Sequence, residues 1–187
     1  AAGYRSKIEA LLALYPWEIQ LTQLNLLSSH DIARALTVMG GDLASLELAV
    51  LLQMTFPGAP CIYYGDEVGL DGGLDPDCRK VFPPENAWHQ SLLKHHKALV
   101  ALRHHYTALR TGSYTVWLTA GDLYGFKREL GDETLLVLVN AGQTAIPVER
   151  AAHGELAADW RAVFGALQMT PEHVTVPSRS GGILAQP

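Results

Sequence analysis

Residues 21–31 read LTQLNLLSSHD, an apolar run that turns polar within a few positions. The density of leucine in so short a segment predicts a buried strand over Leu21–Leu27. Ser28-Ser29-His30-Asp31 follows directly, at the C-terminal end of that strand. Functional groups of parallel α/β proteins gather at the C-terminal ends of strands, so this polar set is the first candidate for a site.

The segments on either side alternate between helical and strand patterns. An apolar stripe over residues 4–14 predicts a short helix, which Pro16 ends. Asp42 is an N-cap candidate for an almost wholly apolar helix over Leu43–Phe56. The short run Cys61–Tyr64 is rich in β-prone residues. Helix, strand, helix and strand in this order favour a parallel α/β architecture.

A loop and a further helix complete the first region. Residues 69–87 are rich in Gly, Asp and Pro and predict a long loop, a type of segment that is often functional. An apolar stripe from Trp88 to Leu109 predicts the helix that follows. Some of its histidines fall off the stripe, namely His89, His96, His104 and His105. A metal site and a solvated face are alternatives for them, and the lack of Cys or acidic partners favours the solvated face.

Beyond about residue 110 the pattern changes to successive strands with turns between them. The predicted strands are Tyr114–Leu118, Leu123–Leu130, Thr134–Val139, His173–Pro177 and Gly182–Ala185. Residues 151–165 are the exception and are expected to hold a helical turn or an insertion. The succession indicates an antiparallel sheet or sandwich. We therefore expect an α/β region over residues 1–108 and a β-sandwich domain over residues 109–187.

The composition limits the class of protein. With 187 residues, 48% of them hydrophobic and 18% charged, the chain can bury a sizeable core. A formal charge of −5 without a basic cluster argues against a nucleic-acid partner and against anionic membranes. No apolar run is long enough to predict a membrane span. The spacing of Cys61 and Cys78 fits neither a disulfide framework nor a structural zinc site.

Two polar sets are expected to meet at one edge of the parallel sheet. One is His30-Asp31 and the other is Tyr63–Glu67, and Asp75 with Arg79 from the long loop can reach the same rim. Carboxylate and imidazole groups match vicinal sugar hydroxyls, and tyrosine offers a flat apolar face. These residue types fit a sugar-binding site, and they equally fit side-chain pairs that only stabilise the fold. Serine-hydrolase chemistry is disfavoured, because no Gly-x-Ser-x-Gly elbow is present.

Three linked motifs resemble conserved regions of the α-amylase family, the glycoside hydrolase family thirteen. They are Asn25–Asp31 with Arg34, then Gln53–Glu67, then Gly72–Arg79. Their sequences are most similar to the neopullulanase, cyclomaltodextrinase and maltogenic amylase group. This resemblance extends from about residue 4 to residue 142. The resemblance implies the last two strands, with their helices, of a (β/α)8 TIM barrel, followed by a C-terminal antiparallel β-sandwich.

The same resemblance implies roles for individual residues. His30 and Asp31 would be catalytic, His30 by a hydrogen bond at the cleavage subsite and Asp31 as the third family carboxylate, which favours the distorted sugar. Asp75, Arg79 and Tyr63 would bind the substrate. The implied partner is an α-glucan oligosaccharide. No cofactor or metal ligand set is evident in this chain, whereas calcium is possible in a longer parent protein; a cytoplasmic location is expected, and the oligomeric state stays open.

One departure from the family pattern is large. A retaining glycosidase needs a nucleophilic carboxylate and a proton donor about 5–5.5 Å apart, and nothing before Ser28 supplies their motifs. We therefore expect the C-terminal part of an α-glucan hydrolase, inactive when isolated. The alternatives are a non-catalytic carbohydrate-binding or scaffold protein and a transglycosylase or isomerase of the same family.

Overall fold

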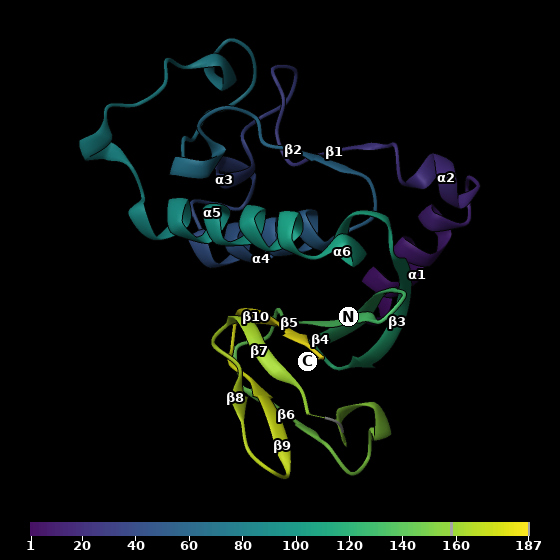
Figure 1. Cartoon of the computed structure of the whole chain (residues 1–187). Coiled ribbons are helices and arrows are strands. Elements are labelled where there is room, and N and C mark those ends of the chain that lie inside the picture. The colour runs from purple at the N-terminus through teal and green to yellow at the C-terminus, as the bar shows by residue number, and fades with distance from the viewer. Residues whose placement is uncertain (158, 187) are drawn as a thin grey trace.

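The computed structural model describes residues 1–157 and 159–186, and its N-terminal half is mainly helical (Figure 1). The helices and strands of this half are α1 (Ala2–Leu12), α2 (Trp17–Gln20), β1 (Leu24–Leu26), α3 (Ala35–Val38), α4 (Leu43–Thr55), β2 (Ala59–Cys61), α5 (Gln90–His105) and α6 (Thr107–Thr111). Single 3-10 turns lie at Asp66–Val68, Asp77–Arg79 and Glu85–Ala87 within the long connection to α5. The predicted succession of helix, strand, helix and strand is therefore confirmed, whereas the short helices α2 and α3 were not predicted.

The strands β1 and β2 form a parallel pair, as expected. Leu24 lies opposite Ala59, and Leu26 lies opposite Cys61. Gln53, which is buried on α4, donates through Nε2 to the carbonyl of Asn25 at 2.9 Å and to that of Cys61 at 3.0 Å. One side chain thus holds both strands against the helix, and the pair places the segments that follow β1 and β2 next to each other.

The predicted length and burial of the first strand are wrong. Strand pairing covers only Leu24–Leu26 instead of Leu21–Leu27, and the preceding Trp17–Gln20 is helical. Leu24 is 61% exposed and Leu26 is 48% exposed, because among the described residues β1 pairs only with β2. The second predicted strand also shifts, from Cys61–Tyr64 to Ala59–Cys61. Leucine density records a tendency to be buried, but burial itself needs a neighbouring element.

The two long helices confirm most of what their patterns predicted. Asp42 caps α4 by accepting a hydrogen bond from the backbone N–H of Ala44 at 3.1 Å. On α5 the stripe residues Leu92 and Leu99 are buried. The exposed histidines of this segment are His89, His104 and His105, as expected for a solvated face.

The expectation for His96 is wrong. Its side chain is only 3% exposed, and its Nδ1 lies 3.0 Å from the carbonyl of Leu92. The reason is that a second element, the 3-10 turn Asp66–Val68, packs on this side of α5. A helix covered on two sides buries residues outside its main apolar stripe.

The C-terminal half is built from antiparallel strands. They are β3 (Ser113–Ala120), β4 (Leu123–Leu130), β5 (Glu133–Asn140), β6 (Ile146–Glu149), β7 (Arg161–Gly165), β8 (Gln168–Met169), β9 (His173–Val176) and β10 (Ser180–Ala185). One sheet has the order β3-β4-β5-β10-β7, and the other has the order β6-β9-β8. The helical turn expected within residues 151–165 is Gly154–Ala157, whereas β6, β7 and β8 were not predicted.

The five-stranded sheet is covered on both faces, so this part of the molecule has three layers (Figure 1). One face, with Phe126 and Val137, joins Leu51 of α4 and Leu99 of α5 in one hydrophobic cluster. The other face packs against the three-stranded sheet, with Leu136, Leu138 and Leu184 meeting Val148 and Val174. The first cluster contains residues from both sides of position 108.

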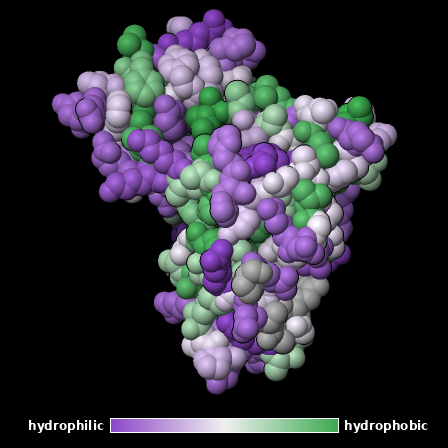
Figure 2. Space-filling view, viewed as in Figure 1, coloured by the Kyte–Doolittle hydropathy of each residue, from purple (hydrophilic) through white to green (hydrophobic). Residues whose placement is uncertain are grey.

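The exposed large apolar side chains include several near β1 and the N-terminal helices. Leu14, Tyr15 and Ile19 are each close to half exposed or more, as is Leu24. On the face shown in Figure 2 hydrophobic atoms lie among hydrophilic ones over the upper, mainly helical part. Among the described residues, no helix has the length and apolar character needed to cross a membrane.

Candidate functional site

His30 and Asp31 lie in the turn after β1, open to solvent. Their side chains are 64% and 71% exposed, with His30 Nε2 and Asp31 Oδ1 3.3 Å apart. The hydroxyl of Ser29 accepts a hydrogen bond from the backbone N–H of Asp31 at 3.1 Å, which shapes this turn. The two side chains therefore face outward together and are accessible to a ligand.

The long loop after β2 attaches directly to this turn. The carbonyl oxygen of His30 accepts hydrogen bonds from Cys78 Sγ at 3.3 Å and from Arg79 Nε at 3.1 Å. Arg79 Nε also pairs with Asp75 Oδ1 at 2.8 Å, and both of these side chains are about half exposed. The structure thus brings Asp75 and Arg79 beside His30, as the sequence predicted. We call His30, Asp31, Tyr63, Asp75 and Arg79 the rim.

Arg34 lies beneath the rim and connects its parts. The side chain is fully buried. Its Nε donates to the carbonyl of Cys78 at 2.8 Å, and its Nη1 donates to the carbonyl of Tyr64 at 2.5 Å. One guanidinium group therefore joins the segment after β1, the segment after β2 and the loop that carries Arg79.

The tyrosines after β2 pack on the same guanidinium. The centre of the Arg34 guanidinium lies 4.0 Å from the ring centroid of Tyr63 and 4.6 Å from that of Tyr64. The Tyr64 hydroxyl donates to the carbonyl of Lys80 at 2.7 Å, so Tyr64 is also tied to the loop. Cation–π contact with a buried arginine fixes the orientation of both rings. Tyr63 is half-buried and keeps part of its surface accessible.

Asp66 belongs to the support beneath the rim. It is 5% exposed, and its Oδ1 lies 3.2 Å from Arg34 Nη1. Burial raises the pKa of Asp66, and hydrogen bonds from Ser28 and Arg34 oppose that shift. The fully buried Ser28 also accepts from the backbone N–H of Ala35 at 2.9 Å.

Sequence reasoning missed this support, although Arg34 stood in the first motif. The available signal was a charged residue within an otherwise largely apolar stretch, Ile32–Leu36. Such a residue is buried only when it is paired and hydrogen-bonded, which predicts an anchor.

The rim offers groups suited to a neutral polyol. Two exposed carboxylates accept hydrogen bonds, Arg79 donates them, and Tyr63 adds an aromatic face. Within residues 1–157 and 159–186, no three His, Cys, Asp or Glu side chains are placed to hold a metal ion.

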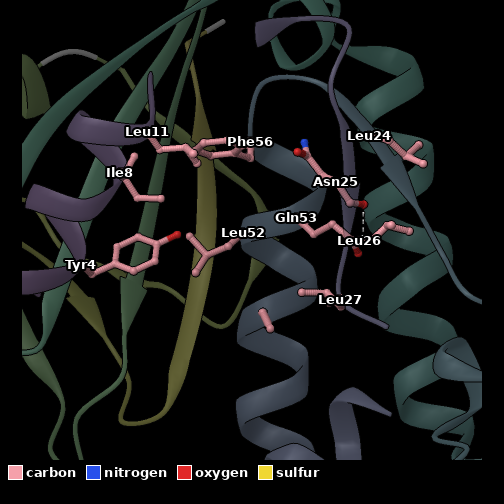
Figure 3. Close-up of a pocket in the computed structure, with 11 residues that line it drawn as sticks. Tyr4, Ile8, Leu11, Leu24, Asn25, Leu26, Leu27, Leu52, Gln53 and Phe56 are labelled. Carbon is pink, nitrogen blue, oxygen red and sulfur yellow. Dashed lines mark hydrogen bonds between the residues drawn. The ribbon is translucent and has the colours of Figure 1, made fainter. Parts of the chain in front are cut away.

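A separate cavity of about 440 Å³ lies between α1, β1 and α4 (Figure 3). Its lining is mostly apolar, with Ile8 and Leu11 from α1 opposite Leu52 of α4 and Phe56, the residue after α4. It includes none of the rim residues. Asn25 and Gln53 there already donate to backbone carbonyls. The lining contains no charged side chain, so this cavity lacks the chemistry of the rim.

Comparisons with known proteins show what the chain as a whole is similar to. Residues 9–85 match the family model described as "Alpha amylase, catalytic domain". A cyclomaltodextrinase of Geobacillus thermopakistaniensis is 41% identical over 162 residues, which are 83% of this chain and 27% of that protein. Neopullulanase 2 of Thermoactinomyces vulgaris is 42% identical over 143 residues, 75% of this chain and 24% of that protein.

A solved structure extends the likeness over the whole chain. The debranching enzyme of Nostoc punctiforme, in an acarbose-soaked crystal, superposes with a TM-score of 0.87 and 49% sequence identity. The match covers 100% of this chain and 38% of that one. The chain thus spans about a quarter of the length of these curated relatives. Together, the matched motifs and the similarity of both sequence and structure show that this chain belongs to the alpha-amylase family.

Proposed function

We propose that this chain is part of a retaining glycoside hydrolase that cleaves α-1,4 or α-1,6 bonds of maltodextrin, cyclodextrin or pullulan. The names of the relatives support an α-glucan substrate. The observation that carries the proposal is the pair of hydrogen bonds from Cys78 and Arg79 to the carbonyl of His30. They join the two motif regions into one exposed, polyol-compatible rim.

In this proposal each rim residue has a role that its contacts support. The Asp31 carboxylate accepts hydrogen bonds from two hydroxyls of the sugar at the cleavage point, and His30 adds one beside it. Arg79 uses Nε within the protein, while its terminal nitrogens make no hydrogen bond with the described residues, so they can donate to a neighbouring sugar. Asp75 orients that guanidinium, and Tyr63 supplies an apolar face.

The proposed architecture assigns residues 1–108 to the end of a (β/α)8 barrel and residues 109–187 to a C-terminal sandwich domain. The parallel β1–β2 pair and the antiparallel sheets support it. The nucleophile and the proton donor, about 5–5.5 Å apart in a retaining enzyme, would come from residues outside 1–187. Residues 1–187 by themselves would then bind sugar without cleaving it.

A turnover assay tests the division of roles. Residues 1–187 are incubated with maltotriose, β-cyclodextrin and pullulan, and the release of reducing ends is measured. We expect no release above a blank without protein. Measurable hydrolysis that Asp31→Ala abolishes would show that the chain carries complete catalytic machinery and would overturn the assignment.

A calorimetric titration with maltotriose tests the rim. Arg79→Ala removes charge-assisted donors and is expected to weaken binding about tenfold. Arg5→Ala is the matched control, because Arg5 and Glu9 also form an i,i+4 pair at 2.8 Å with both side chains about half exposed. Equal affinities for Arg79→Ala and Arg5→Ala, or no binding by the unaltered chain, would contradict the rim as the sugar site.

A further inference from the structure

A second cavity, of about 330 Å³, lies where the helices meet the five-stranded sheet. Its walls include Glu47 and Leu48 from α4, His95 from α5, Phe164 from β7, and Arg179 with Ser180 at the start of β10. None of the rim residues contributes to it.

Two glycines in the lining of this cavity make close packing possible. Gly165 has φ of +84°, and a Cβ there would lie 2.1 Å from the carbonyl oxygen of Gly181. A Cβ on Gly181 would lie 2.6 Å from Leu51 Cδ2. The backbones of β7 and β10 therefore approach each other and α4 as only glycine permits.

A polar cross-link closes one wall. Arg179 has a left-handed backbone, with φ of +47°, which is uncommon for a residue other than glycine. Its Nη2 donates to Ser45 Oγ at 2.9 Å and forms an ion pair with Asp42. The start of β10 is thus fixed to the first turn of α4, and the positive charge of Arg179 is already matched.

His95 lines this cavity and has one ring nitrogen without a partner among the described residues. Its Nε2 lies 2.9 Å from the carbonyl of Glu47, and a carbonyl only accepts, so Nε2 carries the proton. Burial lowers the pKa of His95, which favours the neutral ring at neutral pH. Nδ1 is then an acceptor, and no described residue donates to it.

Glu47 is a second acceptor without a partner. It is half-buried, and its carboxylate makes no hydrogen bond or ion pair with the described residues. Burial raises the pKa of this carboxyl group. A partly desolvated carboxylate gains when a ligand supplies the missing donors. Phe164, whose ring meets His95 edge to face at 5.1 Å, adds an aromatic surface.

We propose that this cavity binds one pyranose unit of a neutral saccharide, at a site separate from the rim. The acceptors of Glu47 and His95 and the hydroxyl of Ser180 suit sugar hydroxyls, while Phe164 suits the apolar face of the ring. Glu47 disfavours an anion, and the paired Arg179 leaves no positive charge for one. The volume is at the lower end for small-molecule sites, which favours one ring over a longer chain.

Nuclear magnetic resonance titration of the isotope-labelled chain with maltose and with glucose tests the proposal. We expect saturable amide shifts near Glu47, His95 and Gly181, with a dissociation constant different from that of shifts near His30 and Arg79. Glu47→Gln is expected to weaken binding at the cavity about tenfold and to leave the rim unchanged. Arg79→Ala should do the reverse, so failure at one site is distinguishable from failure at the other.

Two further variants keep the result interpretable. Glu172→Gln changes an exposed carboxylate outside the cavity and should leave both affinities unaltered. Ala166→Trp, at an exposed position of the lining, should block the cavity without removing any core side chain. Saturable sugar shifts confined to the rim, an unchanged cavity affinity in Glu47→Gln, or saturation by sodium phosphate in place of sugar would each overturn the proposal.

Discussion

Arg34 and Arg79 both belong to contacts around Cys78, but one side chain is buried and the other is exposed, so their roles differ. Arg34 is fully buried, and its charge faces Asp66, two carbonyl groups and two aromatic rings. Arg79 is half exposed, and its pair with Asp75 is accessible to solvent. Exposed pairs contribute little to stability, whereas a buried charge is costly to leave unpaired. Arg34 therefore supports the rim, and Arg79 is free to act at its surface.

Replacing Arg34 should destabilise the fold strongly. Arg34→Met leaves the buried Asp66 carboxylate without its cationic partner, and we expect the free energy of unfolding to fall by about 3–5 kcal/mol. Urea denaturation measures this loss. Arg79→Met is the control and should change stability by about 0.5 kcal/mol or less. Similar losses of unfolding free energy in the two variants would contradict the role of buried Arg34 in stabilising the fold.

His96 should make stability depend on pH. Burial is the main cause that lowers its pKa, while the hydrogen bond to the Leu92 carbonyl and the charges of Glu67 and Asp66 oppose the shift. The unfolded chain binds a proton near the ordinary pKa of 6.5, but the folded chain binds it only at lower pH. The stability that buried, neutral His96 contributes to the fold is therefore fully present above about pH 6.5. This stability is lost as the pH falls through the lowered pKa.

Urea denaturation at several pH values between about 5 and 7.5 tests this effect. We expect the free energy of unfolding of His96→Gln to vary less over this range than that of the unaltered chain. Burial also lowers the pKa of His95. His95 remains in the variant, so part of the dependence of the free energy of unfolding on pH is kept. His104→Gln, at an exposed position of the same helix, should retain the full slope. An identical slope in His96→Gln would contradict the role of His96.

At the scale of elements, α4 is fixed at both ends. Asp42 accepts the N–H of Ala44 at its start. At its end, Arg103 donates to the carbonyl of Met54 at 2.8 Å, and Arg128 of β4 donates to that of Thr55 at 2.5 Å. The last carbonyls of a helix lack partners within the helix, so these buried arginines satisfy groups that would otherwise be orphaned.

Replacing Arg128 should uncouple α4 from the sheet. Arg128 also donates to the carbonyls of Leu109, Gly112 and Ser113 at 3.0, 2.9 and 2.8 Å. Arg128→Met leaves several buried acceptors with fewer donors, at about 1–3 kcal/mol for each group left unsatisfied. We expect a total loss of at least about 3 kcal/mol in chemical denaturation. Arg161→Met, on the exposed side of β7, is the control and should be close to neutral.

At the scale of the whole molecule, helices and sheet share one core. Leu51 and Leu99 from the helices lie in the same cluster as Phe126, Val137 and Ile183 from the sheet. Neither side can bury these residues alone. The boundary proposed near residue 108 therefore separates two architectures, while the packing joins them.

The shared core predicts one cooperative unfolding transition. Helical content can be followed by circular dichroism, and the sheet by the fluorescence of Trp117 after the other tryptophans are replaced by Phe. We expect the two denaturation midpoints to coincide, as for a single two-state unit. Two separated transitions would mean that the regions before and after residue 108 unfold independently.

Local patterns in the sequence predicted much of this molecule. The apolar period of Leu43–Phe56 and the turns at Gly121 and Gly131 indicated α4 and the β3–β4–β5 strands correctly, because helix and hairpin signals depend on near neighbours in the chain. The polar ends of two neighbouring strands, with the long loop after the second, also predicted that Asp75 and Arg79 would lie near His30. The catalytic and binding roles of these residues stay predictions.

What the tertiary structure decided depends on residues far apart in the chain. Leu24 and Leu26 are exposed because burial requires a covering element, and His96 is buried because a turn 30 positions earlier packs on α5. The anchor formed by Arg34 needs Tyr64 and Cys78, 30 and 44 residues away, to supply its acceptors. Periodicity records which face of an element is apolar, but only packing determines which partner meets that face.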